Sequence, residues 1–120
     1  MDKLDYIFQL QKAFDDELCR RRSLKDLDQE TWLQKEVMAI IAELGELLNE
    51  VNFKWWKNPK PLDREKIKEE LVDILHFFTS MCIKMDITSQ ELFEAYKLKN
   101  QENFARQNGT SAKQGYESIP

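Results

Sequence analysis

Two pairs of carboxylates, with the members of each pair three residues apart, are the residues of this chain best suited to chemistry. Glu43 and Glu46 form the first pair, and Glu70 and Asp73 form the second. Because three residues are close to one helical turn, each pair lies on one helix face. If the two helices pack antiparallel, the four carboxylates converge, and such a cluster near a core is costly unless a cation neutralises it. Oxygen ligands select Mg²⁺, or Mn²⁺ as a substitute, so the spacing predicts a magnesium site.

The same acids also allow an ordinary structural interpretation. The first pair shares a helical stripe with Glu36 and Glu50, and a stripe of acids is usually a solvated face. On the helix of the second pair, Glu69 is expected to face solvent. His76, the only histidine, lies one turn after Asp73 and is either a structural residue or a substrate contact.

Four helices are expected to hold these residues, because apolar residues recur at steps of three and four in four segments. The segments are Lys3–Arg22, Gln29–Val51, Arg64–Lys84 and Thr88 to about Gln107. The candidate caps are Ser23, Asp26 or Asp28 before the second helix, Asp63 before the third, Thr88 with Glu91 at the fourth, and Asn-Gly at its end. Short connections predict an all-α, four-helix bundle-like domain over residues 1–108. We expect the tail, residues 109–120, to be either a lid or disordered.

Composition places the chain among globular proteins and excludes several classes. A net charge of −4 argues against a general nucleic-acid binder. No stretch approaches the roughly 20 apolar residues of a membrane span, and no signal peptide is visible, so we expect a cytoplasmic protein without a membrane partner. Cys19 and Cys82 lack metal-ligand spacing and are expected to be free thiols. Seven Phe and three Trp exceed what one small bundle buries, which favours a homodimer or a higher oligomer.

Two further segments carry residues suited to binding a nucleotide. The segment "FKWWKN" places Phe53, Trp55 and Lys57 in a loop, where an aromatic ring either stacks on a base or simply packs. A strip on the last helix either offers donors to phosphate oxygens or is an exposed polar face. The strip comprises Tyr96, Lys99, Asn100, Asn103, Arg106 and Gln107.

The order of these motifs resembles the all-α NTP pyrophosphohydrolase superfamily, which includes MazG-like enzymes and dimeric dUTPases. The ExxE and ExxD pairs match its metal-binding motifs, and "FKWWKN" is similar to the aromatic-basic segment of dimeric dUTPases. The segment "IFQLQKAFD" is similar to their N-terminal helix, where a glutamine reads uracil, and that position is Gln11 here. The segment "YKLKNQENFARQNG" resembles their phosphate-binding segment. This chain is short for a dimeric dUTPase, and the interval between Asp73 and Tyr96 leaves no room for the helices that larger members insert.

The resemblance implies Mg²⁺-dependent hydrolysis of dUTP, with dUDP as a further candidate substrate, to dUMP and pyrophosphate by a dimer. The four acids would hold Mg²⁺, and Glu46 first, or Glu43, would activate the attacking water. The expected substrate contacts are Gln11, Phe53, Trp55, Lys57, His76, Lys99, Asn100, Asn103 and Arg106. Two alternatives stay open. One is the same chemistry on another nucleotide, such as dCTP or a damaged base, and the other is a non-enzymatic helical interaction protein.

Overall fold

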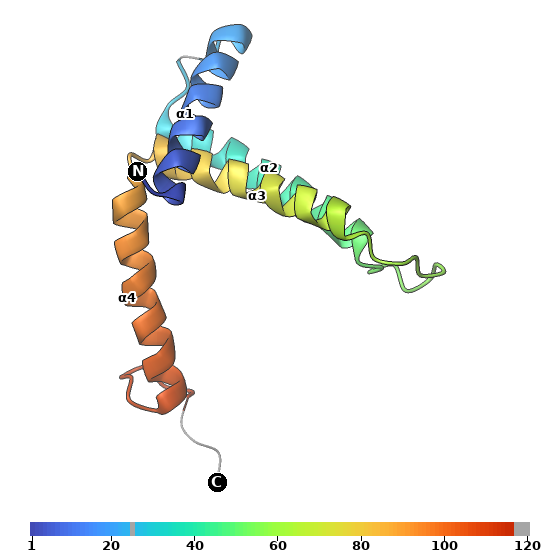
Figure 1. Cartoon of the computed structure of the whole chain (residues 1–120), viewed down its shortest axis with the longest axis vertical. Helices are drawn as coiled ribbons and strands as arrows, with labels where there is room; N and C mark the ends of the chain where they lie inside the picture. Colours follow the sequence, from blue (N-terminus) through green and yellow to red (C-terminus); the bar gives the residue numbers. More distant parts are fainter. Residues whose placement is uncertain (25, 117–120) are drawn as a thin grey trace. The chain divides into compact units, whose positions relative to one another are not determined.

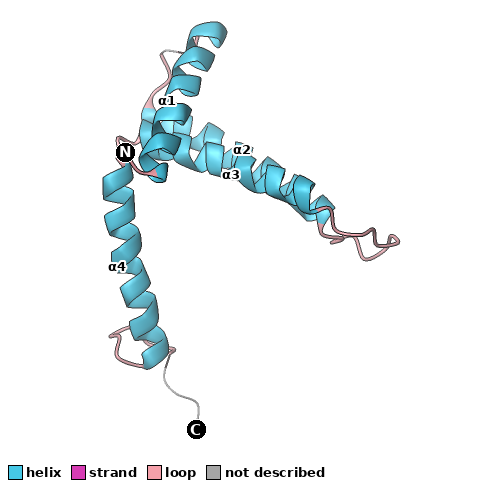
Figure 2. Cartoon of the chain, viewed as in Figure 1, coloured by secondary structure: helices cyan, strands magenta, loops and turns pink. Residues whose placement is uncertain are grey.

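The fold is all-α. The computed structural model describes residues 1–24 and 26–116, and over that part of the chain every regular element is a helix (Figures 1 and 2). The elements are α1 (Lys3–Arg22), α2 (Gln29–Glu50), α3 (Arg64–Lys84) and α4 (Ser89–Asn108). These bounds confirm the four predicted helices to within a residue or two. None of these helices combines the length and the apolar content that crossing a membrane requires.

Local capping explains where the helices begin and end. The carboxylate of Asp28 accepts a backbone hydrogen bond at the start of α2, and Asp63 does the same at the start of α3. The hydroxyl of Thr88 caps α4, which ends at Gly109 with a φ of 75°. Each cap satisfies backbone groups that have no partner inside the helix, and glycine adopts a positive φ without strain. The caps predicted at these four residues are therefore confirmed.

The chain divides into two compact units, Met1–Ile87 and Thr88–Pro120. In the first unit, α3 packs against both α1 and α2, and α2 and α3 run antiparallel and side by side (Figure 1). In the second unit, the residues after α4 fold back onto that helix. The Ser111 hydroxyl donates to Glu102 over 2.6 Å, and the Tyr116 ring lies 5.7 Å from the guanidinium carbon of Arg106. Residues 117–120 of the predicted tail lie outside the described residues.

The interior of the first unit is unusually polar. Among the described residues, Phe8 and Cys82 are the buried apolar side chains. The buried polar and charged side chains are Gln11, Asp15, Glu36, Thr79 and Ser80. Many large apolar side chains on α1, α2 and α3 are instead exposed, including Phe14, Ile41 and Leu71. Cys19 and Cys82 are free thiols, as predicted.

Candidate functional site

Three of the four predicted metal ligands converge where α2 lies against α3. One carboxylate oxygen from each of Glu43, Glu46 and Glu70 lies within 4.8 Å of the others. Asp73 stands one turn beyond Glu70 on α3 and lines a cavity together with Glu43. The carboxylates therefore gather on facing surfaces of two antiparallel helices, which is the arrangement that the paired spacing predicts.

The antiparallel register of the two helices explains this convergence. Glu46 faces Glu70, and ten residues earlier on α2, Glu36 contacts Ser80, which lies ten residues later on α3. The same register places Glu43 opposite Asp73. Because side chains on one helix face recur every three or four residues, both acid pairs lie on the same seam between the helices.

The cluster has more negative charge than its surroundings can satisfy. The Oε2 atoms of Glu43 and Glu70 are buried and have no hydrogen-bond partner among the described residues. The pKa of Glu70 is raised to about 7, first by burial and then by its contact with Glu43 and the negative charge of Glu46. Burial is also the main cause that raises the pKa of Glu43. Burial and the neighbouring acids thus raise the pKa of both carboxyl groups. Such a cluster of carboxylate oxygens fits a hard divalent cation, because the cation would stabilise their ionised form.

A cavity of about 450 Å³ extends from this cluster between the three helices of the first unit. Glu43 and Asp73 line it, and so do the aromatic side chains of Phe14, Trp32 and Phe77. Its volume and its mixture of apolar walls with a few polar groups are typical of a small-molecule site. The acids and this cavity together form one continuous candidate site within the first unit.

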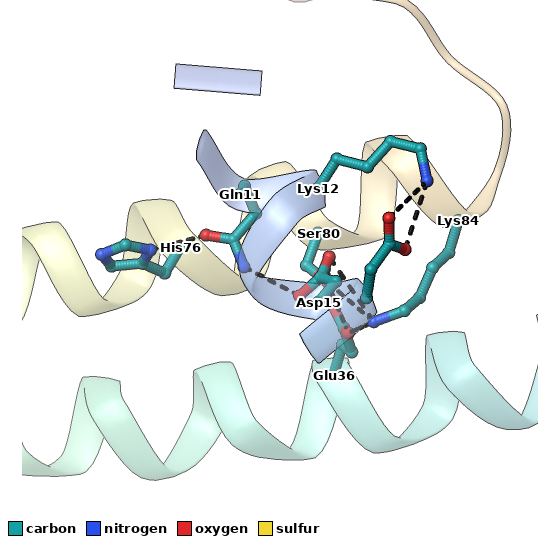
Figure 3. Close-up of polar contacts among 8 residues, drawn as sticks. Gln11, Lys12, Asp15, Glu36, His76, Ser80 and Lys84 are labelled. Carbon is teal, nitrogen blue, oxygen red and sulfur yellow. Dashed lines mark hydrogen bonds and ion pairs between the residues drawn. The ribbon is translucent and has the colours of Figure 1, made fainter. Parts of the chain in front are cut away.

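A chain of polar contacts borders the cavity (Figure 3). The Nδ1 atom of His76 lies 2.6 Å from Oε1 of Gln11, and Nε2 of Gln11 donates to Asp15 over 2.9 Å. Ser80 lies 2.7 Å from carboxylate oxygens of both Asp15 and Glu36. Both ends of the Gln11 amide are therefore engaged within the protein, and the ring of His76 is held in place by Gln11.

Lys84 closes the far end of this network. Its ammonium contacts Glu36 in an ion pair, donates to Ser80 over 2.8 Å and lies 3.9 Å from Asp15. It also lies 3.8 Å from the centroid of the Trp32 ring, a cation–π contact. Lys84, whose side chain is only 15% exposed, thus lies within ion-pair distance of two buried carboxylates, one from α1 and one from α2.

The loop between α2 and α3 is tied at its base. Asn52 adopts a φ of 60°, and its side-chain amide both donates to and accepts from the backbone of Lys60, each over 2.9 Å. Phe53 and Lys57 line a second cavity of about 230 Å³ inside this loop. Trp55 is 85% exposed and lies edge-on to Trp56 at 4.7 Å between centroids. The loop thus presents an exposed aromatic side chain, and its role in stacking on a base stays a prediction.

The predicted phosphate strip lies on α4, in the second unit. Lys99, Asn100 and Asn103 are exposed there, and Lys99 forms no ion pair within the described part of the chain. Arg106 is engaged, because it donates to Glu102 over 3.1 Å as well as contacting Tyr116. These residues form part of the surface of α4, and their role in binding phosphate stays a prediction.

Sequence reasoning missed the roles of four residues: Asp15, Glu36, Ser80 and Lys84. Glu36 was grouped with a solvated stripe, although it is 5% exposed. A signal for part of the network was present, because Ser80 follows Asp73 by seven residues just as Glu36 precedes Glu43 by seven. In an antiparallel pair, such matched intervals place the two residues opposite each other.

Comparison with known sequences places this all-helical chain among the MazG-like, all-α nucleoside triphosphate pyrophosphohydrolases. More specifically, the chain belongs to the dUTPase family designated dUTPase_2, whose sequence profile matches residues 3–91.

Three relatives of the chain come from bacteriophages. The chain is 32% identical to the dCTP pyrophosphatase of Enterobacteria phage T4 over 106 residues, covering 88% of this chain and 61% of the relative. It is 38% identical to the dCTP pyrophosphatase of Enterobacteria phage LZ5 over 74 residues, covering 62% and 43%. A DNA replication protein of phage T4 is 30% identical over 99 residues, covering 82% and 25%. The chain thus spans less than two thirds of each of these relatives, and no solved structure gives a significant match.

Proposed function

We propose that this protein hydrolyses a deoxynucleoside triphosphate to the monophosphate and pyrophosphate. The observation that carries the proposal is the convergence of Glu43, Glu46 and Glu70, with two buried carboxylate oxygens that have no partner among the described residues. Family membership supports the same reaction class. In the reaction, water adds to a phosphorus of the α–β phosphoanhydride, that P–O bond breaks, and pyrophosphate leaves.

The donor set favours Mg²⁺ as the cofactor, with Mn²⁺ as a substitute. Glu43, Glu46, Glu70 and Asp73 would hold it, because they offer only oxygen atoms and lie on one seam. When bound, such an ion supplies positive charge to the phosphate oxygens and acidifies water. The unpartnered Oε2 atoms of Glu43 and Glu70 are the groups whose burial such a charge would compensate.

Among the acids, Glu46 is best placed to accept the proton of the attacking water. It is exposed, whereas Glu43 and Glu70 are half-buried. An exposed carboxylate at the rim of the cluster keeps an oxygen free to orient water and take its proton. Glu43 is the second candidate for this role, because burial raises its pKa and so makes it a stronger base.

The remaining predicted residues would bind the substrate. Lys99, Asn100, Asn103 and Arg106 on α4 offer donors for phosphate oxygens, and Arg106 would exchange its contact with Glu102 for phosphate. Phe53 and Trp55 in the exposed loop, with Lys57 beside them, would contact the part of the nucleotide that lies outside the cavity.

For the base, we propose cytosine ahead of uracil. The family description is dUTPase, which supports the dUTP prediction, while two relatives are named dCTP pyrophosphatases. The glutamine that the resemblance assigned to uracil, Gln11, already donates to Asp15 and accepts from His76. Gln11 would therefore have to give up an internal contact to bind uracil, which favours dCTP as the substrate.

We also propose that the protein works as a homodimer or a higher oligomer. One chain leaves many large apolar side chains of α2 and α3 exposed, among them Ile41, Leu71 and Val72. Exposed apolar area of this kind marks interaction surfaces in soluble proteins.

The test is turnover on a panel of dNTPs with Mg²⁺ present and pyrophosphate detected directly. Glu70→Gln should reduce the rate by at least 100-fold, because it removes one of three converging ligands. Its matched control is Glu69→Gln, the same substitution at the neighbouring exposed residue, which should keep wild-type activity. Pyrophosphate release at a normal rate by Glu70→Gln, or no release from any dNTP by the wild type, contradicts the proposal.

A further inference from the structure

One buried carboxylate oxygen belongs to a residue that lines the cavity. Glu36 is 5% exposed, and its Oε2 atom is buried without a hydrogen-bond partner among the described residues. Glu36 also lines the cavity of about 450 Å³ that begins at Glu43 and Asp73. A buried carboxylate oxygen without a donor is costly, and native proteins rarely leave one unless ordered water, an ion or a ligand completes it.

The neighbours that contact Glu36 bond its other carboxylate oxygen, Oε1, and none of the described residues donates to Oε2. Oε1 of Glu36 already contacts the Lys84 ammonium and the Ser80 hydroxyl. That hydroxyl has a single proton and also lies 2.7 Å from Asp15, which competes for it. Two carboxylates share one ammonium here, so the network keeps one excess negative charge. A ligand that enters the cavity is therefore favoured if it brings a donor and disfavoured if it brings an acceptor.

The position of Glu36 in the cavity indicates that the base of a nucleotide would supply the donor for Oε2. Glu36 lies seven residues, or about 10 Å of helix, from Glu43 along α2. With the phosphates at the Glu43 end, the other end of the same cavity receives the base. The walls near that end include the aromatic side chains of Trp32 and Phe14, as a planar heterocycle requires.

We propose that Oε2 of Glu36 accepts a hydrogen bond from the exocyclic amino group of cytosine and so sets the preference of the site for cytosine over uracil. This inference rests on the proposed function, since it assumes that the cavity receives the base of the substrate. Uracil has a carbonyl oxygen in place of the amino group. That oxygen would face the unpaired carboxylate, and repulsion between two buried acceptors would exclude it.

Equilibrium binding of the monophosphate products tests this assignment separately from catalysis. Calorimetry with dCMP and dUMP should show tighter binding of dCMP to the wild type. Glu36→Gln replaces the carboxylate by a neutral amide, which can donate to a carbonyl or accept from an amine. The ratio of the dUMP and dCMP dissociation constants should fall by about 10- to 100-fold, because the variant binds dCMP more weakly and dUMP no more weakly than the wild type. Glu30→Gln, at an exposed position on the same helix, is the matched control and should bind both as the wild type does.

A change in the ligand tests the same assignment without altering the protein. The monophosphate of 2-pyrimidinone deoxyriboside lacks the amino group, and the wild type should bind it about 10- to 100-fold more weakly than dCMP. Equal binding of dCMP and this analogue by the wild type overturns the assignment. So does a Glu36→Gln protein that loses affinity for dCMP and dUMP by the same factor. Absence of pyrophosphate release from any dNTP would instead refute the proposed reaction, because binding preference is measured independently.

Discussion

Replacing Glu70 by glutamine should stabilise the metal-free protein and reduce the stability that it gains from Mg²⁺. In the metal-free protein, burial and neighbouring acids raise the pKa of Glu70 from 4.5 to about 7. The native state therefore resists losing this proton, and at pH 8 the ionised carboxylate destabilises the fold. Glu70→Gln removes that charge, so the metal-free variant should melt above the wild type at pH 8. At about pH 5 the native carboxylate is protonated, and the two proteins should melt closer together.

Mg²⁺ should stabilise the wild type more than the variant. At a Mg²⁺ concentration about 100 times Kd, the wild type gains about 2.7 kcal/mol, which is several degrees in melting temperature. If the loss of one converging carboxylate weakens binding on the order of 100-fold, the variant gains only about 0.4 kcal/mol at the same concentration. The melting temperature of the variant should therefore rise by less than that of the wild type when Mg²⁺ replaces EDTA.

The assay is a thermal melt followed by circular dichroism at pH 8, in EDTA and across a MgCl₂ titration. Glu69→Gln is the control for removing one negative charge from the same region of α3, and it should follow the wild type under every condition. A Glu70→Gln protein that gains as much from Mg²⁺ as the wild type would show that Glu70 is not a ligand. A wild type that gains nothing from Mg²⁺ would refute the metal site itself.

Three further predictions concern the pH dependence of stability, the buried ion pairs of Lys84 and the assembly of the chain. The urea midpoint of the metal-free wild type should fall as pH rises from about 5 to 8, because native Glu70 retains a proton there that the unfolded chain releases; a flat profile contradicts this. Lys84→Met should lower the free energy of unfolding by about 3–5 kcal/mol, since two buried carboxylates lose their cation. Adding Glu36→Gln should recover part of that loss in urea unfolding, and strictly additive losses would contradict the coupling. Sedimentation velocity should give at least twice the mass of one chain, and a monomer contradicts the proposed oligomer.

Local signals made the helices and the acid pairs predictable. Asp28, Asp63, Thr88 and Gly109 have physical reasons to cap a helix that depend only on their immediate neighbours. The acid pairs are equally local, because spacing within a helix fixes which face they share. Convergence of the two pairs then needed one further assumption, antiparallel packing, which the short connecting loop supports.

The polar network could not be predicted in the same way. Asp15 comes from α1, and helical periodicity does not specify where α1 contacts α3. A charged residue such as Glu36 has the same sequence signature whether it faces solvent or a buried lysine. Its burial depends on Lys84 and Ser80 arriving from another helix, which is a property of the packing and not of the residue.

The double hydrogen bond between Asn52 and Lys60 has a consequence for how this fold could diversify. It closes the loop on itself just beyond the end of α2, so a change in the length or content of residues 53–59 is absorbed before it reaches either helix. The alignment of Glu46 with Glu70 would be preserved while the aromatic loop is exchanged. Selection could thus change the aromatic surface of the loop and leave the acid cluster between α2 and α3 unchanged.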